Sequence, residues 1–443
     1  MTIPAELLNS LKDLPGLDEA AFIEAHREEN RITSLRLNPF KPVTLDFETG
    51  KPVAWCKEGY YLDQRPSFTQ DPLFHAGCYY VQEAGSMFIE FALRHSVDLS
   101  RDMNVLDLCA APGGKSTLIN SLISKHSLLI SNETVKNRAG ILAMNLSKWG
   151  QANVVVCNND AAQMGALEGF FDVMVVDAPC SGSGLFRKQP EAIAEWSEKA
   201  VLACAERQGS ILEDSLPGLK EGGILIYSTC SYSPAENEAV VERLIQEAGM
   251  EYVALPVPRD WGLVDSGRGY RFYPHLTQSE GFFCAVLRKK GESGQTGSRW
   301  KKPLTLSANE RQTWEPLLSG EGLDLMKKND RYYALNERAM AFVGANEKRL
   351  YFKKAGLCLG EVKGKDLVPD QELAWASALA EDLYRVDLNY EQALAYLKKE
   401  KVNGLEAKQG LCLMTYKGQG LGWAKCLPGR MNNYYPQEYR VLK

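Results

Sequence analysis

Several features that the sequence lacks exclude whole classes of protein. No run of eighteen apolar residues occurs, so we expect no helix that spans a membrane. The first residues, MTIPAELLNSLKDLPG, lack the basic-then-apolar pattern of a signal peptide. The 11 cysteines include no C-x-x-C pair, which argues against a zinc site and against a disulfide framework. We therefore expect a protein of the reducing cytoplasm that binds no metal.

An overall surplus of positive charge is also missing, because the net charge is −5. The distribution is uneven, however, with about −13 for residues 1–280 and about +8 for residues 281–443. A basic C-terminal third on an acidic body is the asymmetry expected of a nucleic-acid footprint. An ordinary solvated surface gives the same count, so the charge alone leaves both interpretations open.

The length and composition predict several domains with ample core. A chain of 443 residues favours two to four domains, and 45% hydrophobic residues are typical of a globular protein. Near the amino terminus we expect two helices and then a strand, SLRLNPFK, on which Arg36 and Asn38 share one face. A loop rich in aromatic residues leads to a helix from about Gln82. The expected units are 1–98, a sheet domain at 99–290, a polar linker at 291–306, a small α+β region at 307–384 and a strand-rich module at 385–443.

Between residues 103 and 290, short apolar runs alternate with amphipathic stretches. Runs such as VMVV and GILIY show no polar alternation, which is typical of strands buried on both faces. Strands that alternate with helices predict an α/β fold with a doubly wound, Rossmann-like parallel sheet. The last run, FFCAVL, follows a long irregular stretch and is expected to insert antiparallel. The strands are expected at 103–108, 127–131, 152–157, 171–177, 222–228 and 281–288, and the helices at 115–125, 134–148, 190–216 and 234–247.

The stretch NVLDLCAAPGGKST at 104–117 predicts a strand, a turn of small residues and the start of a helix. Gly113 and Gly114 allow a ligand to approach the backbone closely. The end of the turn matches the P-loop pattern G-x-x-x-x-G-K-[ST], but Cys109 stands where the first glycine belongs. By itself the turn fits an imperfect P-loop, a nucleoside-binding turn or a plain strand-to-helix connection.

Polar residues follow the carboxyl ends of the next strands, where an open α/β sheet binds its ligand. Glu133 is placed to accept hydrogen bonds from ribose hydroxyls, and Asp160 to accept one from the amino group of adenine. Either acid alone is often only a helix cap. With Asp177 at a third strand end, the set favours a bound nucleoside.

Two cysteines, Cys180 in DAPCSGSG and Cys230 in STCSY, follow neighbouring strands and should face one crevice. A thiolate is a natural nucleophile for C6 of a pyrimidine, and its addition makes C5 able to take a methyl group. A free thiol needs positive potential to ionise, which Lys115 and helix N-termini would supply, while Asp177 would bind the N3–N4 edge of cytosine. The alternatives are two buried cysteines acting as small apolar residues or a disulfide.

The last segment, GLCLMTYKGQGLGWAKCLPGRMNNYYP, combines basic and aromatic residues on expected strands. Such interleaving suits single-stranded or looped RNA. A packed β core with solvated lysines explains the composition equally well.

Taken together, DLCAAPGGK (107–115), DAPCSGSG (177–184), STCSY (228–232) and RFYPHLTQSEGFF (271–283) resemble the Nop/Sun family of RNA 5-methylcytosine methyltransferases. The C-terminal segment resembles that of the bacterial RsmF/YebU branch, whose last part is PUA-like. The resemblance is strong over residues 30–290 and moderate beyond. It implies a Rossmann-like methyltransferase sheet, a C-terminal PUA-like RNA-binding module at 385–443 and a folded rRNA substrate, from the small subunit near the decoding region.

The resemblance also implies roles for individual residues. Cys230, of the threonine–cysteine pair, is the expected nucleophile, and Cys180 is expected to serve product release. S-adenosylmethionine is the implied cofactor, and the implied RNA-side residues are Arg36, Asn38 and Arg187. Alternatives are a tRNA methyltransferase, a non-catalytic ribosome-assembly factor and an ATP-binding enzyme, and we expect a monomer. The residues expected to hold the cofactor are Cys109, Ala110, Ala111, Pro112, Gly113, Gly114, Lys115, Glu133, Asp160 and Asp177.

Overall fold

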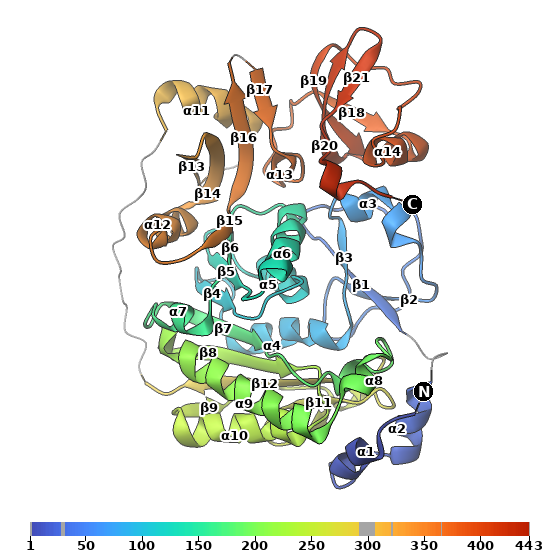
Figure 1. Ribbon diagram of the computed structural model, residues 1–443, viewed down its shortest axis with the longest axis vertical. Coiled ribbons are helices and arrows are strands. Elements are labelled where there is room, and N and C mark those ends of the chain that lie inside the picture. Colours follow the sequence, from blue (N-terminus) through green and yellow to red (C-terminus); the bar gives the residue numbers. More distant parts are fainter. Residues whose placement is uncertain (1, 28–31, 292–305, 320–321, 365, 443) are drawn as a thin grey trace.

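The computed structural model describes residues 2–27, 32–291, 306–319, 322–364 and 366–442 (Figure 1). The linker expected at 291–306 lies, apart from its two end residues, outside the described residues. Among the described helices, none combines the length and the apolar character that a membrane span requires.

A ten-stranded sheet forms the centre of the molecule (Figure 1). Its five parallel strands lie in the order β6-β5-β4-β7-β8, the arrangement of a Rossmann-like sheet. The strand order reverses between β4 and β7, so a ligand is expected above these two carboxyl ends. The predicted fold class is confirmed. The five strands are β4 (Asn104–Asp107), β5 (Leu128–Asn132), β6 (Val154–Cys157), β7 (Phe171–Asp177) and β8 (Leu219–Thr229).

Helices cover both faces of this sheet, which explains why its strands carry apolar residues without alternation. One face packs on α4 (Ile89–Ser96), α5 (Gly114–Leu122) and α6 (Lys136–Trp149). The other face packs on α7 (Ala161–Gly165), α9 (Glu198–Ser215), α10 (Glu238–Glu247) and α12 (Glu337–Asn346).

Antiparallel strands extend the sheet at both edges. As predicted, β12 (Phe282–Lys289) is antiparallel to β8. At the other edge β15 (Phe352–Ala355), from the region expected as a separate domain, pairs with β6. The boundaries drawn from the sequence stay predictions, but this region contributes both β15 and α12 to the central layers. Beside β12 lie β9 (Met250–Tyr252), β11 (Tyr270–Phe272) and, paired with β11, β10 (Val264–Asp265).

Two four-stranded sheets follow the central one in the chain. The first contains β13 (Leu323–Lys328), β14 (Arg331–Asn336), β16 (Leu357–Lys363) and β17 (Asp366–Pro369), preceded by α11 (Ala308–Trp314). The second contains β18 (Arg385–Leu388), β19 (Gly410–Tyr416), β20 (Gln419–Leu427) and β21 (Arg430–Asn433), with α14 (Tyr390–Leu397) between the first two.

The amino-terminal region and the C-terminal module share one hydrophobic core, and Figure 1 shows them side by side. Leu35 and Tyr79 of the small sheet β2-β1-β3 belong to the same buried cluster as Tyr396 and Tyr435. The hydroxyl of Tyr416 also donates a hydrogen bond to Asp46 at 2.8 Å. The amino-terminal elements are α1 (Ala5–Leu11), α2 (Glu19–Ala25), β1 (Thr33–Leu37), β2 (Gly59–Leu62), α3 (Pro72–His75) and β3 (Tyr79–Val81).

Several predicted elements were wrong in extent. The helix expected from about Gln82 begins as a 3-10 turn at Gly85–Phe88 and becomes α-helical only at Ile89, while residues 79–81 pair with β1 as a strand. The loop expected before β7 contains α7, which Asp160 caps. The long helix expected at 190–216 divides into α8 (Ala192–Glu195) and α9, since Ser197 adopts an extended conformation and caps α9. Between β17 and β18 the chain forms one short α-helix, α13 (Gln371–Ala374).

Three of the four aromatic residues of the last segment, Tyr416, Trp423 and Tyr435, are core residues. Trp423 and Tyr435 are 3% and 0% exposed, and the indole of Trp423 donates a hydrogen bond to the carbonyl of Asp370. Nearby, Lys417 and Lys425 pair with Asp46 and Asp366. The packed-core interpretation therefore holds for Trp423 and Tyr435, whereas Tyr434 is only partly buried.

Candidate active site

The turn that follows β4 is fixed by hydrogen bonds from side chains of α6. Gly113, the residue directly before α5, has a φ of +115°, a backbone conformation that favours glycine. From α6, Arg138 donates to the carbonyl of Ala111 at 2.9 Å, and Asn145 donates to that of Pro112 at 2.8 Å. The turn lines a cavity of about 150 Å³ together with Gln82, Glu83, Asp177 and Lys188. A small-residue turn fixed beside a cavity suits a ligand that approaches the backbone.

Asp107, at the end of β4, is fully buried beneath this turn. Burial raises its pKa to about 7, against the opposing effect of the hydrogen bond that the Ser116 hydroxyl donates to it. Its Oδ1 has no hydrogen-bond partner within the described residues. An ionised Asp107 therefore costs folding free energy.

We expect Asp107→Asn to stabilise the protein more at pH 8 than at pH 5. The folded pKa lies above the unfolded one, so wild-type stability falls as the pH rises from about 4 to about 7. Integrated over that window, the difference between pH 5 and pH 8 is about 2–3 kcal/mol. Thermal unfolding at the two pH values measures it, with the exposed Asp265→Asn as the matched control. An equal shift at both pH values would contradict the prediction.

Arg36 supports the turn after β4 and the start of α5, and it does not face solvent. It is 1% exposed, and its guanidinium donates to the carbonyl of Gly114 at 3.2 Å and to the Thr117 hydroxyl at 2.6 Å. Asn38, also 1% exposed, donates to the carbonyls of Gly77 and Trp149. Direct RNA contact by these side chains does not agree with their burial. They instead attach the amino-terminal sheet to α5 and α6.

The two acids expected at the cofactor occupy different environments. Glu133 is buried, accepts a hydrogen bond from the backbone N–H of Val135 at 2.9 Å and pairs with Arg138 at 3.4 Å. Asp160 is exposed and caps α7 through a capping box with Gln163. The cap interpretation therefore holds for Asp160, whose second carboxylate oxygen makes no hydrogen bond to the described residues.

Lys115 and Asp177 form an ion pair at the point where the strand order reverses. Lys115 Nζ lies 2.8 Å from Asp177 Oδ2, and the Ser228 hydroxyl donates to Asp177 Oδ1 at 2.9 Å. Burial lowers the pKa of Lys115, but the adjacent charges of Asp177 and Asp107 outweigh it and raise that pKa. Lys115 therefore stays cationic and brings positive charge to the crevice.

The structure brings the two cysteines together. The Sγ atoms of Cys180 and Cys230 lie 2.8 Å apart, within hydrogen-bonding distance, and both cysteines are free. Each is partly exposed, unlike Cys157 and Cys284, which are fully buried in the sheet. The pKa of the Cys180 thiol is raised well above its ordinary value, first by its hydrogen bond with Cys230 and then by burial. Two thiols at neighbouring strand ends can act on one substrate atom in sequence.

Glu236 is a residue of this site that sequence reasoning missed. It is fully buried, and its carboxylate accepts hydrogen bonds from the backbone N–H and hydroxyl of Ser181 and from the hydroxyl of Ser231. Each serine directly follows one of the two cysteines. The only signal in the sequence is an acid shortly after STCSY, in a segment that otherwise resembles the start of a helix.

Arg187, expected beside a substrate channel, is buried. It is 2% exposed, pairs with Glu280 at 3.1 Å and donates to the carbonyls of Ala25 and Ser279. Its neighbour Lys188 instead lines the cavity at the turn after β4. Arg187 therefore fixes the loop around the site, whereas the exposed Lys188 shares the cavity with Lys115.

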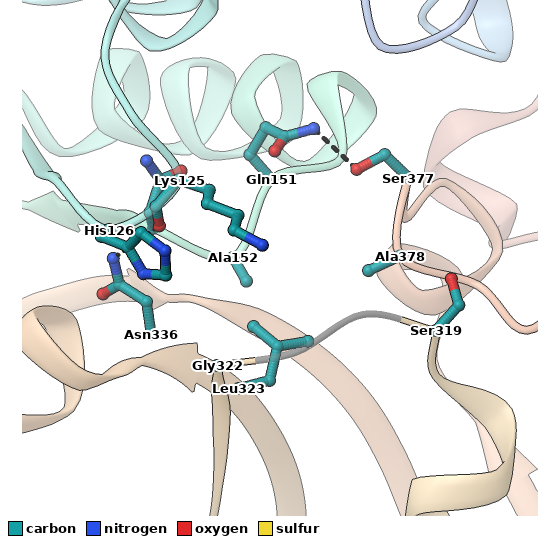
Figure 2. A pocket seen from close by; sticks show the side chains of 11 residues that line it. Lys125, His126, Gln151, Ala152, Ser319, Gly322, Leu323, Asn336, Ser377 and Ala378 are labelled. Atoms are coloured by element: carbon teal, nitrogen blue, oxygen red, sulfur yellow. Dashed lines mark hydrogen bonds between the residues drawn. The ribbon is translucent and has the colours of Figure 1, made fainter. Parts of the chain in front are cut away.

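A second cavity, of about 300 Å³, lies at the opposite ends of β5 and β6 (Figure 2). Figure 2 shows Lys125 and His126 on one side of it and Ser319 on the other, with Gln151 donating a hydrogen bond to Ser377. It lies away from the cysteines and contains none of the expected site residues. Within the described ranges, no cluster of His, Cys, Asp and Glu is arranged to hold a metal.

Three family models match the chain in order. Residues 3–84 match the N-terminal domain of 16S rRNA methyltransferase RsmF, residues 95–288 match 16S rRNA methyltransferase RsmB/F, and residues 384–441 match the methyltransferase RsmF PUA domain. These segments contain the amino-terminal sheet, the central parallel sheet and the sheet β18–β21.

Relatives and solved structures agree with these matches. The ribosomal RNA small subunit methyltransferase F of Shewanella woodyi is 30% identical, covering 98% of this chain and 96% of the relative, and that of Serratia proteamaculans is 30% identical, covering 91% and 89%. A methyltransferase homologue from Pyrococcus horikoshii has a TM-score of 0.52 at 28% identity, covering 65% of this chain and 100% of the other. NSun6 from Pyrococcus horikoshii, solved with SFG, has a TM-score of 0.55 at 23% identity, covering 65% and 99%, and shows the shared fold.

The family resemblance inferred from the motifs is thereby confirmed. A small-residue turn beside a cavity, acids at successive strand ends and a nucleotide-binding strand order all fit S-adenosylmethionine. The chain belongs to the RsmF-type group of the RsmB/F family of 16S rRNA methyltransferases, which use S-adenosylmethionine to methylate rRNA at C5 of cytosine.

Proposed function

We propose that this protein methylates one or a few cytosines of 16S rRNA near the decoding region, through a covalent bond between Cys230 and C6 of the base. The observation that carries the proposal is the pair of free thiols, 2.8 Å apart, beside the Lys115–Asp177 ion pair. The target base must leave its stack to reach a thiol in this crevice.

The proposed chemistry conserves protons and electron pairs. The Cys230 thiolate adds to C6, and the electrons of the C5–C6 double bond make C5 nucleophilic. Bound S-adenosylmethionine would supply the methyl group as its S–CH3 bond breaks, leaving S-adenosylhomocysteine, and Cys230 loses its thiol proton to solvent before each addition. When the C6–S bond breaks, Cys180 gives its proton to the departing Cys230 sulfur and takes the proton from C5, which restores the double bond. Asp177 orients the N3–N4 edge of the base, and Lys115 stabilises the Cys230 thiolate before addition.

We assign the cofactor to the turn Cys109–Lys115 together with Glu133, Asp160 and Asp177. The exposed Lys188 and the basic C-terminal third would contact phosphates, which position RNA without reading its sequence. A single self-contained crevice requires no second copy, so we propose a monomer that acts in the cytoplasm, where its rRNA substrate is found.

We expect Glu133→Ala to weaken S-adenosylmethionine binding about tenfold, which corresponds to about 1.4 kcal/mol. The carboxylate lies at the carboxyl end of β5, where it would accept hydrogen bonds from the ribose hydroxyls. Isothermal titration of the purified protein measures the dissociation constant. The exposed Glu251→Ala is the matched control and should bind normally. Unchanged affinity in Glu133→Ala would remove Glu133 from the cofactor site.

Bisulfite sequencing of rRNA and tRNA from cells with and without the gene tests the proposed substrate. We expect one or a few cytosines of small-subunit rRNA to lose protection when the gene is absent. Loss confined to tRNA would preserve the chemistry and change the substrate. No change in either RNA would favour a non-catalytic assembly factor.

A further inference from the structure

A single buried carboxylate connects the two loops that carry the cysteines. Glu236 Oε1 accepts a hydrogen bond from the backbone N–H of Ser181 at 2.7 Å, and Oε2 accepts one from the Ser181 hydroxyl at 2.6 Å. Oε2 also accepts from the hydroxyl of Ser231. Ser181 follows Cys180 and Ser231 follows Cys230. Each cysteine is therefore the chain neighbour of a serine that is hydrogen-bonded to Glu236.

Glu236 is itself fixed in place, so it can transmit a defined geometry. Its backbone carbonyl accepts a hydrogen bond from the hydroxyl of Tyr227 at 2.6 Å. The next residue, Asn237, accepts from the Thr229 hydroxyl at 2.6 Å and donates to the carbonyl of Ser231 at 2.8 Å. All these partners are buried. Hydrogen bonds to a buried charged group are stronger than those between neutral groups. Removing one of them leaves the buried charged group without that partner, which costs free energy.

We propose that Glu236 is a positioning residue for the methyl-transfer reaction, which holds Cys180 and Cys230 at the separation that lets one thiol act on the other. This inference rests on the proposed roles of the two cysteines. The carboxylate of Glu236 makes no hydrogen bond to the sulfur of Cys180 or Cys230 among the described residues. The residue acts through Ser181 and Ser231, and without it the two loops lose their common anchor.

The charge of Glu236 also acts on the thiol of Cys180. The groups that face Cys180 are Cys230, Glu236 and Asp177, and after the Cys230 hydrogen bond and burial, these negative charges raise the pKa of the Cys180 thiol further. Lys115, by contrast, interacts favourably with the charge of Cys230. Cys180 thus keeps its proton, as a group that must give a proton to the departing sulfur requires. Two further titratable groups interact with this cluster, namely Cys204 and Tyr227.

The test compares Glu236→Gln with wild type in the full-length protein. Glutamine keeps the size of the side chain but removes the charge and replaces one acceptor oxygen by a donor. We expect kcat for methylation of 16S rRNA to fall between tenfold and a hundredfold, with the dissociation constant for S-adenosylmethionine unchanged within twofold. Site-resolved mass spectrometry after iodoacetamide treatment across pH should show the Cys180 alkylation midpoint at a lower pH than in wild type, because a carboxylate that raises the pKa of this thiol has been removed.

Two further variants separate positioning from general damage to the fold. The exposed Glu247→Gln, on α10, is the matched control and should match wild type in both assays. Ser231→Ala removes one of the three hydrogen bonds and keeps the charge, so it should lower kcat while leaving the Cys180 midpoint in place. If Glu236→Gln kept wild-type kcat, or lost activity with an unmoved midpoint, the inference would be overturned.

The failure of this inference and that of the proposed function give different results. If wild type methylates rRNA and Glu236→Gln matches it in both assays, only the role of Glu236 is lost. If wild type methylates no RNA, the proposed function fails, and an unmoved Cys180 midpoint in Glu236→Gln would overturn this inference independently.

Discussion

Replacing Cys230 by alanine abolishes methylation of 16S rRNA while S-adenosylmethionine still binds with near wild-type affinity. The reason is chemical, since alanine has no nucleophile to add to C6, and without that addition C5 does not attack a methyl group. Cys230 is partly exposed at the end of β8 and packs in no core cluster, so its loss should leave the fold intact. We expect a loss of at least a thousandfold, a barrier increase of about 4 kcal/mol.

Tritium transfer from labelled cofactor to rRNA measures this loss, and isothermal titration checks cofactor binding in the same preparation. Ser210→Ala serves as the control, because Ser210 is an exposed residue of α9 outside the cluster of the two cysteines and Glu236. Residual activity within tenfold of wild type would show that Cys230 is not the nucleophile.

Replacing Cys180 by alanine should trap the protein on its RNA. If Cys180 supplies the proton for the departing Cys230 sulfur, its removal stops the reaction after methyl transfer, with the C6–S bond intact. We expect a protein–RNA species that survives denaturing electrophoresis and accumulates to a large fraction of the enzyme, whereas wild type shows almost none. The distance of 2.8 Å between the two sulfurs is the basis for this expectation.

The double variant Cys180→Ala, Cys230→Ala is the decisive control for the trapped species. It should form no adduct, because the nucleophile is gone. An adduct that persists in the double variant would place the covalent bond elsewhere, and a Cys180→Ala protein that turns over normally would remove Cys180 from product release.

The sequence predicts the central sheet well because its strands are buried on both faces. Predicted 171–177 coincides with β7, and the antiparallel insertion of β12 is also confirmed. Continuous apolar runs identify these strands in the sequence. In a parallel sheet the ligand-binding residues follow the carboxyl ends of the strands, so their positions follow once the strands are known. For the same reason the sequence places Lys115, Asp177, Cys180 and Cys230 around one crevice.

What the sequence misses depends on contacts between distant segments. The family resemblance implies that Arg36 and Arg187 lie on the RNA side. In the structure both are buried, because Arg36 is hydrogen-bonded to Thr117 and Arg187 to Glu280, which are distant in the sequence. The strand β15 belongs to the central sheet only because β6 lies at an exposed edge that it can cover. Glu236 has no local signature, since its role arises from two serines on different loops.

The hydrophobic cluster shared by Leu35, Tyr79, Tyr396 and Tyr435 has a consequence for biosynthesis. The ribosome makes the first two of these residues between about 320 and 400 positions before the last two, which at about 5–20 residues per second is a delay on the order of tens of seconds. During that time the newly made amino-terminal sheet lacks its apolar partner and is exposed to chaperones and proteases. Proteins truncated by premature termination would leave this surface permanently uncovered, so quality control can recognise them by their beginning rather than by their missing end.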